Sequence, residues 1–392
     1  MSVNNRQSGS YLSKVRDASS LFAGAFGDPP AAAAVAPGRV NIIGDHIDYC
    51  GGTVLPMAIN RWTAVVGSLR DDGMIRWAQQ PDDDAERDED GKVIVPIETH
   101  AQDEPRPEPG LSMSYIAGTV QTVLDEIGQS GKGLDVVLAS NVPIGAGLSS
   151  SATLCASVAM CVLKLTGAEL DPQRVAKLCQ RVEHEWASVP CGIMDQYAVV
   201  LSQAGHATMI DCARDDVSHV PVPDDIGWLI LDTGTRRSLA DSAYADRRDV
   251  CARAAEKFGV EYLCHASLDD VNDPYARHVI SEHHRVRAVV DAIQARDMKI
   301  VGQCMIESHA SLRDDYKVSS PALDRAVQAL CAMDSVRGAR MTGAGFGGCV
   351  IAAVQKDSME VVIAKVRDRV LHTISPRATV FAVHPVDCAR SL

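Results

Sequence analysis

The sequence of 392 residues lacks the segments that mark secreted, membrane-spanning and disulfide-bonded proteins. Residues 1–17 are polar and contain no apolar signal-peptide core, and no uninterrupted apolar run reaches the roughly 18 residues of a membrane span. The 12 cysteines are scattered from Cys50 to Cys388, and no two have Cys-x-x-Cys spacing. We therefore expect reduced cysteines that behave as small buried hydrophobic residues, in a cytoplasmic protein.

Positive charge is also scarce. The chain has 38 lysines and arginines against 51 aspartates and glutamates, which gives a net charge of -13 at neutral pH. This balance argues against nucleic acid or an anionic membrane as a partner, because both bind to basic patches on a protein surface. A polyanion such as ATP would need a local positive or dipolar pocket. We expect small molecules as the ligands and favour a monomer.

The length suggests one large or two ordinary domains, and 46% hydrophobic residues are enough to fill their cores. Helices are expected over residues 11–26, 111–123, 151–165 and 172–187, strands over 54–59, 134–140 and 228–233, and a solvated loop over the charged run 81–90. Composition does not mark the domain boundary. We place it near residue 205, where Gly205 and His206 follow an apolar helix, so that the predicted domains are 1–205 and 206–392.

Both common nucleotide-binding loops are missing. The glycine-rich loop has no P-loop lysine, and the chain has no Asp-Phe-Gly of the protein kinases. Residues 343–348 spell Gly-x-Gly-x-x-Gly, but an apolar, β-like run follows where a dinucleotide-binding unit needs a helix. The candidate that remains is residues 143–152, PIGAGLSSSA, which join a predicted strand to a predicted helix.

This candidate segment has the chemistry of a phosphate loop. At the start of a helix, backbone N–H groups and the helix dipole converge on an anion, and glycines let the chain approach it closely. Ser149, Ser150 and Ser151 add hydroxyl groups, one of which could hold Mg²⁺. The alternative is a serine-rich helix N-cap that binds no ligand.

One early segment combines several ionisable side chains. Arg39, Asp45, His46 and Asp48 lie within ten residues, between small and β-branched neighbours. Buried acids and bases are costly unless they are paired, so these side chains more plausibly face a ligand that carries several hydroxyl groups. A further acid, Asp195, follows a glycine turn at the expected start of a helix, where on its own it would only cap that helix.

Together these segments resemble the galactokinases, sugar kinases of the GHMP superfamily: residues 38–49 resemble their first motif, 143–152 the second and 338–348 the third. The resemblance spans about residues 36–350. It implies an α+β fold of two domains, with mixed sheets covered by helices and the active site in the cleft between the domains. It also implies that ATP and Mg²⁺ serve to phosphorylate the C1 hydroxyl of galactose, which gives galactose 1-phosphate and ADP.

The resemblance implies roles for individual residues as well. Asp195 would be the base beside the anomeric hydroxyl, with Arg39 as its electrostatic partner. A nearby arginine would lower the pKa of Asp195, so positioning of the hydroxyl is an alternative to early proton abstraction. Glu183 would bind Mg²⁺ together with Ser151, or else be an exposed helical acid. The sugar would be held by Asp45, His46, Asp48, Gly192 and Tyr244, and the nucleotide by Pro143, Gly145, Ala146, Gly147, Leu148, Ser149, Ser150, Ser151 and Gly345.

Two departures from the pattern leave the sugar open. Galactokinases usually have glutamate where this chain has Asp45. Its shorter side chain would fall roughly one C–C bond short of a C6 hydroxyl, so it would lose a direct hydrogen bond or require a bridging water. Residues 47–58 also resemble the N-acetylgalactosamine kinases, whereas residues 189–196 have the galactokinase form. The alternatives are therefore another sugar 1-kinase, for N-acetylgalactosamine or a pentose such as arabinose, and a non-catalytic sensor of galactose and ATP. The intact serine motif and Asp195 favour an enzyme.

Overall fold

The computed structural model describes residues 4–81, 95–236, 243–269 and 271–392, and the side chains of these residues except those of 4–10 and 243–246. The predicted charged loop at residues 81–90 lies outside the described residues, apart from Pro81. Among the described residues, no helix is long and apolar enough to cross a membrane.

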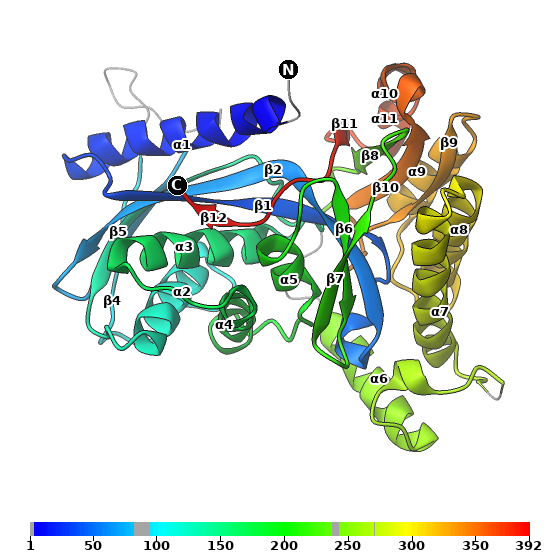
Figure 1. The fold of residues 1–392 in the computed structure, drawn as a ribbon, viewed down its shortest axis with the longest axis horizontal. Helices are drawn as coiled ribbons and strands as arrows, with labels where there is room; N and C mark the ends of the chain where they lie inside the picture. Colours follow the sequence, from blue (N-terminus) through cyan, green and yellow to red (C-terminus); the bar gives the residue numbers. More distant parts are fainter. Residues whose placement is uncertain (1–3, 82–94, 237–242, 270) are drawn as a thin grey trace.

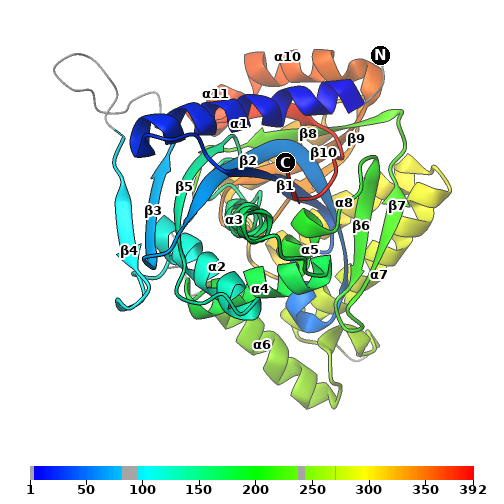
Figure 2. The ribbon, with the colours of Figure 1, turned by 60° about the vertical axis from the view of Figure 1, so that its left-hand side comes forward.

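The larger sheet has eight strands and carries the first two motifs (Figure 1). Its main path runs β12-β1-β2-β5-β3-β4, and β6 and β7 form a hairpin that pairs with β2. Helix α1 covers one face, and α2, α3, α4 and α5 lie on the other, as both views show (Figures 1 and 2). The strands are β1 (Ala32–Ile43), β2 (Thr53–Arg70), β3 (Met74–Gln79), β4 (Glu98–Ala101), β5 (Gly133–Ser140), β6 (His206–Asp211), β7 (Asp216–Pro221) and β12 (Arg390–Ser391), and the helices are α1 (Asn4–Phe26), α2 (Ser112–Glu126), α3 (Ser150–Thr166), α4 (Pro172–Glu185) and α5 (Met194–Val200).

The smaller sheet has four antiparallel strands in the order β11-β8-β10-β9. Helices α8 and α9 pack on β9, and α10 packs on β11. This sheet carries the third glycine motif, which joins β9 to β10. Its strands are β8 (Ile226–Asp232), β9 (Val336–Met341), β10 (Cys349–Gln355) and β11 (Thr379–Val383). The helices of this part are α6 (Ala243–Phe258), α7 (Pro274–Gln294), α8 (Met298–Asp314), α9 (Pro321–Cys331), α10 (Met359–Arg369) and α11 (Leu371–Ile374). Short 3-10 turns are η1 (Asp48–Cys50), between β1 and β2, and η2 (Leu263–His265) and η3 (Lys356–Ser358).

The predicted helices and strands are present, and two of the strands are longer than expected. Strand β1 runs without a break through Pro37 and Gly38, where its register against β2 shifts. Strand β2 has 18 residues, because its buried run continues past Ile59. The domain boundary near residue 205 stays a prediction, and β6, β7 and β12, all beyond that residue, belong to the larger sheet.

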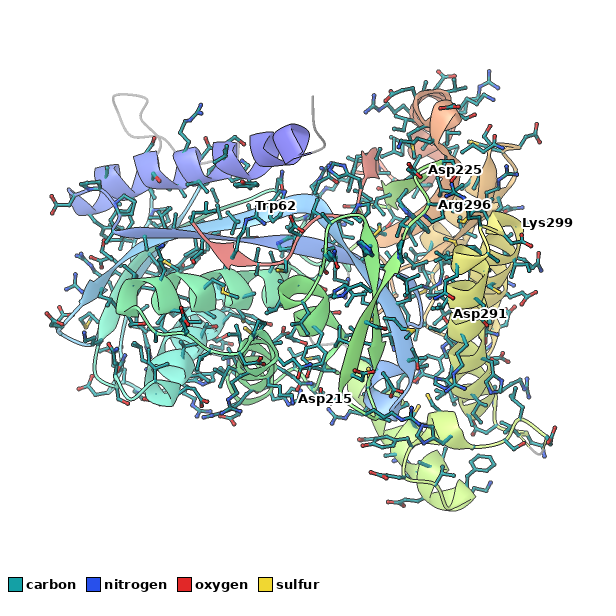
Figure 3. The ribbon with its side chains drawn as sticks, viewed as in Figure 1. Trp62, Asp215, Asp225, Asp291, Arg296 and Lys299 are labelled. Carbon is teal, nitrogen blue, oxygen red and sulfur yellow. The ribbon has the colours of Figure 1, made fainter. Side chains whose placement is uncertain are left out.

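The ends of the described chain pack together on the larger sheet. Trp62 of β2 is buried, with its ring 5.4 Å from that of Tyr11 in α1 (Figure 3). The guanidinium of Arg390, in β12, lies over both rings. In the part that carries the smaller sheet, Arg296 and Asp225 form an exposed ion pair of 2.9 Å between the α7–α8 turn and the start of β8. The two sheets meet where β1 ends, and the polar residues of the first motif lie at that junction.

Candidate active site

One cavity of about 420 Å³ lies where the three motifs meet. Its walls come from the end of β1, the loop before α3, the start of α5 and the loop between β9 and β10. Of the residues predicted for the site, the cavity is lined by Arg39, Asp45, His46, Asp48, Gly145, Gly147, Ser149, Ser150, Ser151, Glu183, Gly192 and Asp195. These residues are far apart in the sequence, so the fold brings together what the motifs only suggested.

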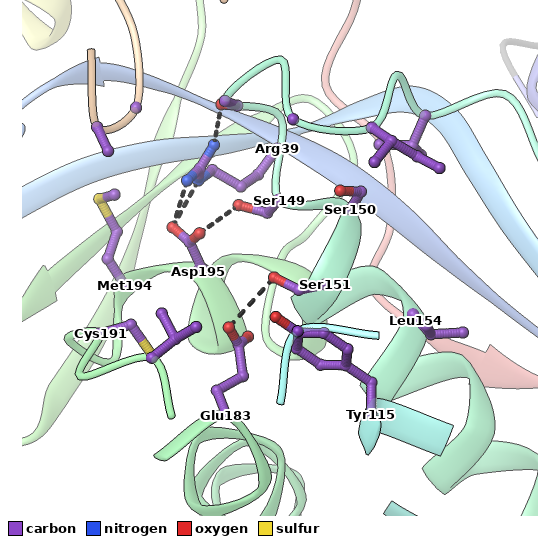
Figure 4. Close-up of a pocket in the computed structure, with 18 of the residues that line it drawn as sticks. Arg39, Tyr115, Ser149, Ser150, Ser151, Leu154, Glu183, Cys191, Met194 and Asp195 are labelled. Carbon is purple, nitrogen blue, oxygen red and sulfur yellow. Dashed lines mark hydrogen bonds and ion pairs between the residues drawn. The ribbon is translucent and has the colours of Figure 1, made fainter. Parts of the chain in front are cut away.

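Asp195 is fixed from both sides (Figure 4). Arg39 donates to Oδ1 of Asp195 from Nε at 2.8 Å and from Nη2 at 2.5 Å, while Ser149 Oγ donates to Oδ2 at 2.5 Å. A third nitrogen of Arg39 donates to the carbonyl of Gly147 at 2.5 Å. The side chain of Asp195 is 26% exposed, against 4% for Arg39. The carboxylate is therefore held in one orientation and remains open toward the cavity.

Glu183 lies on α4 beside the serine loop. Ser151 Oγ donates to Glu183 Oε2 at 3.2 Å, and Gln196 Nε2 donates to Oε1 at 2.8 Å. Glu183 is buried, so the exposed-acid alternative is wrong. Burial raises the pKa of Glu183 to about 7, and the negative charge of Asp195 adds to the effect.

The surroundings of Glu183 fit a magnesium ion. A carboxylate and a hydroxyl are hard oxygen ligands, which Mg²⁺ prefers. Gln196 Oε1 is buried and has no hydrogen-bond partner among the described residues. A cation would relieve the repulsion between Glu183 and Asp195 and would favour the ionised form of Glu183.

Asp48 also lines the cavity. The backbone N–H of Met194 donates to Asp48 Oδ2 at 3.4 Å. Burial, with repulsion from Asp195 as the second cause, raises the pKa of Asp48 to about 6. A Cβ atom at Gly192 would lie 1.9 Å from Oδ2 of Asp48, so only glycine leaves this carboxylate in place.

Asp45 and His46 both form polar contacts with the third motif. Asp45 Oδ2 lies 2.7 Å from Arg340 Nη1, and Oδ1 accepts a hydrogen bond of 3.0 Å from the Gly343 N–H. Burial outweighs the attraction of Arg340 and raises the pKa of Asp45. His46 Nε2 lies 3.2 Å from the Ala344 carbonyl oxygen. Contacts of these two residues with a sugar stay a prediction.

The phosphate loop and the third motif touch through their backbones. A Cβ atom at Gly147 would lie 2.9 Å from the Thr342 carbonyl oxygen, and one at Gly343 would lie 2.9 Å from the Gly147 carbonyl oxygen. Both glycines have φ near +80°, namely 76° and 81°. Neither position therefore tolerates a side chain.

Four residues predicted for the nucleotide do not line the cavity: Pro143, Ala146, Leu148 and Gly345. Gly345 lies in close backbone contact, because a Cβ atom there would lie 2.1 Å from the Val318 carbonyl oxygen, and its nucleotide role stays a prediction. Tyr244, predicted for the sugar, belongs to α6, and its side chain is outside what the structure describes.

Two functional side chains received no role from the sequence. Gln196 adjoins Asp195, which was the only signal available for it. Arg340 is fully buried in β9, where Nε donates to Ser308 Oγ at 3.1 Å and Nη2 lies 3.6 Å from Glu282 Oε1. A charged residue in a strand flanked by apolar residues indicates a buried partner, but nothing local identifies that partner.

Comparison with known proteins decides the family. Residues 20–69 match the model described as the galactokinase galactose-binding signature, residues 114–203 the GHMP kinases N terminal domain, and residues 289–371 the GHMP kinases C terminal domain. Galactokinase from Bos taurus is 38% identical over 377 residues, which cover 93% of each chain, and galactokinase from Homo sapiens is 38% identical over 350 residues, which cover 86% of this chain and 88% of the relative. The chain belongs to the galactokinase family.

Solved structures agree with membership of the galactokinase family. The crystal structure of Lactococcus lactis galactokinase complexed with galactose has a TM-score of 0.85 and 28% identity, and the match covers 95% of this chain and 98% of that one. Mevalonate kinase from Methanococcus jannaschii has a TM-score of 0.65 at 18% identity and shares the fold. The predicted GHMP kinase fold is confirmed. Arg39, Asp45, His46 and Asp48 all fall within the part that matches the galactose-binding signature.

Proposed function

We propose that this chain transfers the γ-phosphoryl group of ATP to the C1 hydroxyl of galactose, giving galactose 1-phosphate and ADP. The carrying observation is the placement of Asp195, which Arg39 and Ser149 hold beside the serine loop in the same cavity. Membership of the galactokinase family supports this acceptor, as does the set of acids around the cavity, which suits a ligand with several hydroxyl groups.

The hydrogen bonds of Asp195 suit an orienting role. A carboxylate offers about four lone-pair sites. Arg39 and Ser149 occupy three of them in this structure, and the exposed part of the side chain leaves room for one hydroxyl donor. Phosphoryl transfer passes through a loose transition state, in which orientation of the attacking hydroxyl and neutralisation of charge dominate. Asp195 would orient the C1 hydroxyl and accept its proton late.

We infer that Ser151 and Glu183 hold Mg²⁺, which when bound would neutralise charge on the phosphates of ATP. Gln196 fixes the rotamer of Glu183 through its hydrogen bond of 2.8 Å. Gly145 and Gly147 would let the backbone of the loop approach the phosphates, and the start of α3 would direct its N–H groups toward them.

On the sugar side, Asp48 would accept hydrogen bonds from ring hydroxyls, with Gly192 keeping its carboxylate in place. Specificity would come from buried polar groups that stay unpaired when the wrong epimer enters. Asp45, His46 and Tyr244 remain predicted sugar ligands.

The test is ADP release with MgATP and galactose, N-acetylgalactosamine, arabinose, glucose or galacturonate, with a control that contains no sugar. Strong preference for galactose is expected. Preference for another sugar would keep the kinase and change its substrate. Binding of galactose and ATP without turnover of any sugar would contradict the proposal and favour a sensor.

A further inference from the structure

A chain of hydrogen bonds leads from the wall of the cavity into the core. His46 Nδ1 lies 2.9 Å from the Tyr49 hydroxyl, which lies 2.9 Å from the Tyr316 hydroxyl. The Tyr316 hydroxyl in turn lies 3.2 Å from Cys251 Sγ. Tyr316 and Cys251 are buried; Tyr316 lies two residues beyond the end of α8, and Cys251 lies on α6. None of the three residues behind His46 has a part in the proposed reaction.

For a neutral His46 ring, the direction of donation along this chain follows from its first member. The Ala344 carbonyl can only accept a hydrogen bond, so His46 Nε2 must carry a proton. In a neutral imidazole, Nδ1 is then the acceptor, and the Tyr49 hydroxyl donates to it. Each phenol has a single proton, so the Tyr49 oxygen accepts from Tyr316 and the Tyr316 oxygen accepts from the Cys251 thiol. The reverse direction would require a second proton on His46.

The surroundings keep the members of the chain from turning. The ring of Tyr316 packs 5.0 Å from that of His46 and 4.6 Å from that of His278. Burial raises the pKa of the Tyr316 hydroxyl, which therefore stays a donor. His46 itself has a φ of 67°, a left-handed conformation that is costly for a residue with a side chain and persists only where the surroundings fix it.

We propose that Tyr49, Tyr316 and Cys251 are positioning residues that hold His46 as the neutral Nε2–H tautomer. This tautomer anchors Ala344, and with it the third glycine motif, on the cavity wall. The inference rests on the proposed function and deepens it, because it assigns the shape of the sugar side of the cavity to residues on α6 and beyond α8 that contact no substrate.

The first test is spectroscopic and needs no turnover. The full chain is labelled with 15N in its histidine rings, and His46 is identified by its through-space contacts with the ring of Tyr49, which distinguish it from His278. At neutral pH the 15N shifts are expected to show a protonated Nε2 and an unprotonated Nδ1. A doubly protonated ring, or a proton on Nδ1 alone, overturns the proposal even if the chain phosphorylates galactose.

The second test removes one hydroxyl and keeps its ring. Tyr316→Phe is expected to raise the KM for galactose about tenfold, the effect of one lost hydrogen bond, and to leave kcat and the KM for ATP within about twofold. The matched control is Tyr275→Phe: that ring packs 5.6 Å from Tyr316, but its hydroxyl has no hydrogen-bond partner in the described part of the chain. The control is expected to keep the galactose KM, and an unchanged KM in Tyr316→Phe contradicts the proposal.

Cys251, the last member of the chain of hydrogen bonds, allows a rescue experiment. Serine can donate a hydrogen bond to Tyr316 and alanine cannot, although the two side chains are similar in size. Cys251→Ala is therefore expected to raise the galactose KM severalfold more than Cys251→Ser. Equal effects of the two variants would show that Cys251 acts only through packing. Failure of the proposed function is distinct from these outcomes, since the wild-type chain would then not turn over galactose at all.

Discussion

Two arginine and aspartate pairs flank the cavity, and they differ in access to it. The side chains of Arg39 and Asp195 are 4% and 26% exposed, whereas those of Arg340 and Asp45 are 0% and 2% exposed. The first pair leaves part of a carboxylate available to a ligand. The second pair is enclosed by Gly343, by Glu282 of α7 and by Ser308 of α8. The same chemistry thus leaves a carboxylate open to a ligand in one pair and holds a loop in the other.

The largest effect on the open pair is expected from Asp195→Asn. The variant keeps the shape of the side chain but loses the charge, so kcat for galactose should fall about 10³-fold while galactose binding by calorimetry persists. Asp291→Asn makes the same change on the exposed face of α7 and serves as the control (Figure 3). Turnover that matched the control would remove Asp195 from the mechanism.

Loss of the buried pair of Arg340 and Asp45 should affect stability more than catalysis. Arg340→Met leaves Asp45 buried without its charged partner, which is expected to lower the free energy of unfolding by about 3–5 kcal/mol. Denaturation monitored by tryptophan fluorescence measures the loss. Arg39→Met is the matched variant, and its smaller loss of stability should accompany a larger loss of kcat, because Asp195 can be partly solvated. An equal loss of stability in the two variants would contradict the distinction.

Through Asp48, the stability of the protein is expected to depend on pH. Its pKa is raised from 3.8 to about 6, so the folded state binds more protons than the unfolded state between these values, and this contribution to stability is lost as pH rises through about 6. Asp48→Asn removes the titration. The stability of the wild type relative to this variant is therefore expected to fall by up to about 3 kcal/mol from pH 4 to pH 7. Thermal unfolding across this range measures the difference, and a flat difference would show that Asp48 does not titrate.

The smallest effect comes from a methyl group beside the open pair. Gly192→Ala places a Cβ atom where Asp48 Oδ2 now lies, so the galactose KM should rise about tenfold through loss of one good hydrogen bond. Gly24→Ala is the control, since nothing lies within 4 Å of its added Cβ in helix α1. Similar KM values for the two variants would show that Asp48 can shift at no cost.

The sequence was sufficient for local features of the site. The serine loop joins β5 to α3 and Asp195 lies in the first turn of α5, as the glycines and the apolar runs predicted. The contact between Arg39 and Asp195 was expected only through the family resemblance, since local patterns do not say which distant residues meet.

Other features could not be predicted for the same reason. The alternation of apolar residues predicts a strand but does not name its partner, so the return of β6, β7 and β12 to the larger sheet was not foreseen. Asp45 was expected to fall short of a sugar hydroxyl, but its ion pair with Arg340 depends on how the two sheets meet. Likewise, the composition of α7, α8 and β9 gave no sign that Glu282 and Ser308 enclose that arginine.

The pairing of β12 with β1 has a consequence for how the molecule is made. Ala34 and Val35 pair with Ser391 and Arg390, so one side of the strand that carries Arg39 gains its neighbour from the far end of the chain. During synthesis this edge of β1 stays unpaired until the smaller sheet, its helices and β12 have emerged from the ribosome. Such distant pairing slows folding. Until then the strand that supplies Arg39 to the site has an open edge at Ala34 and Val35.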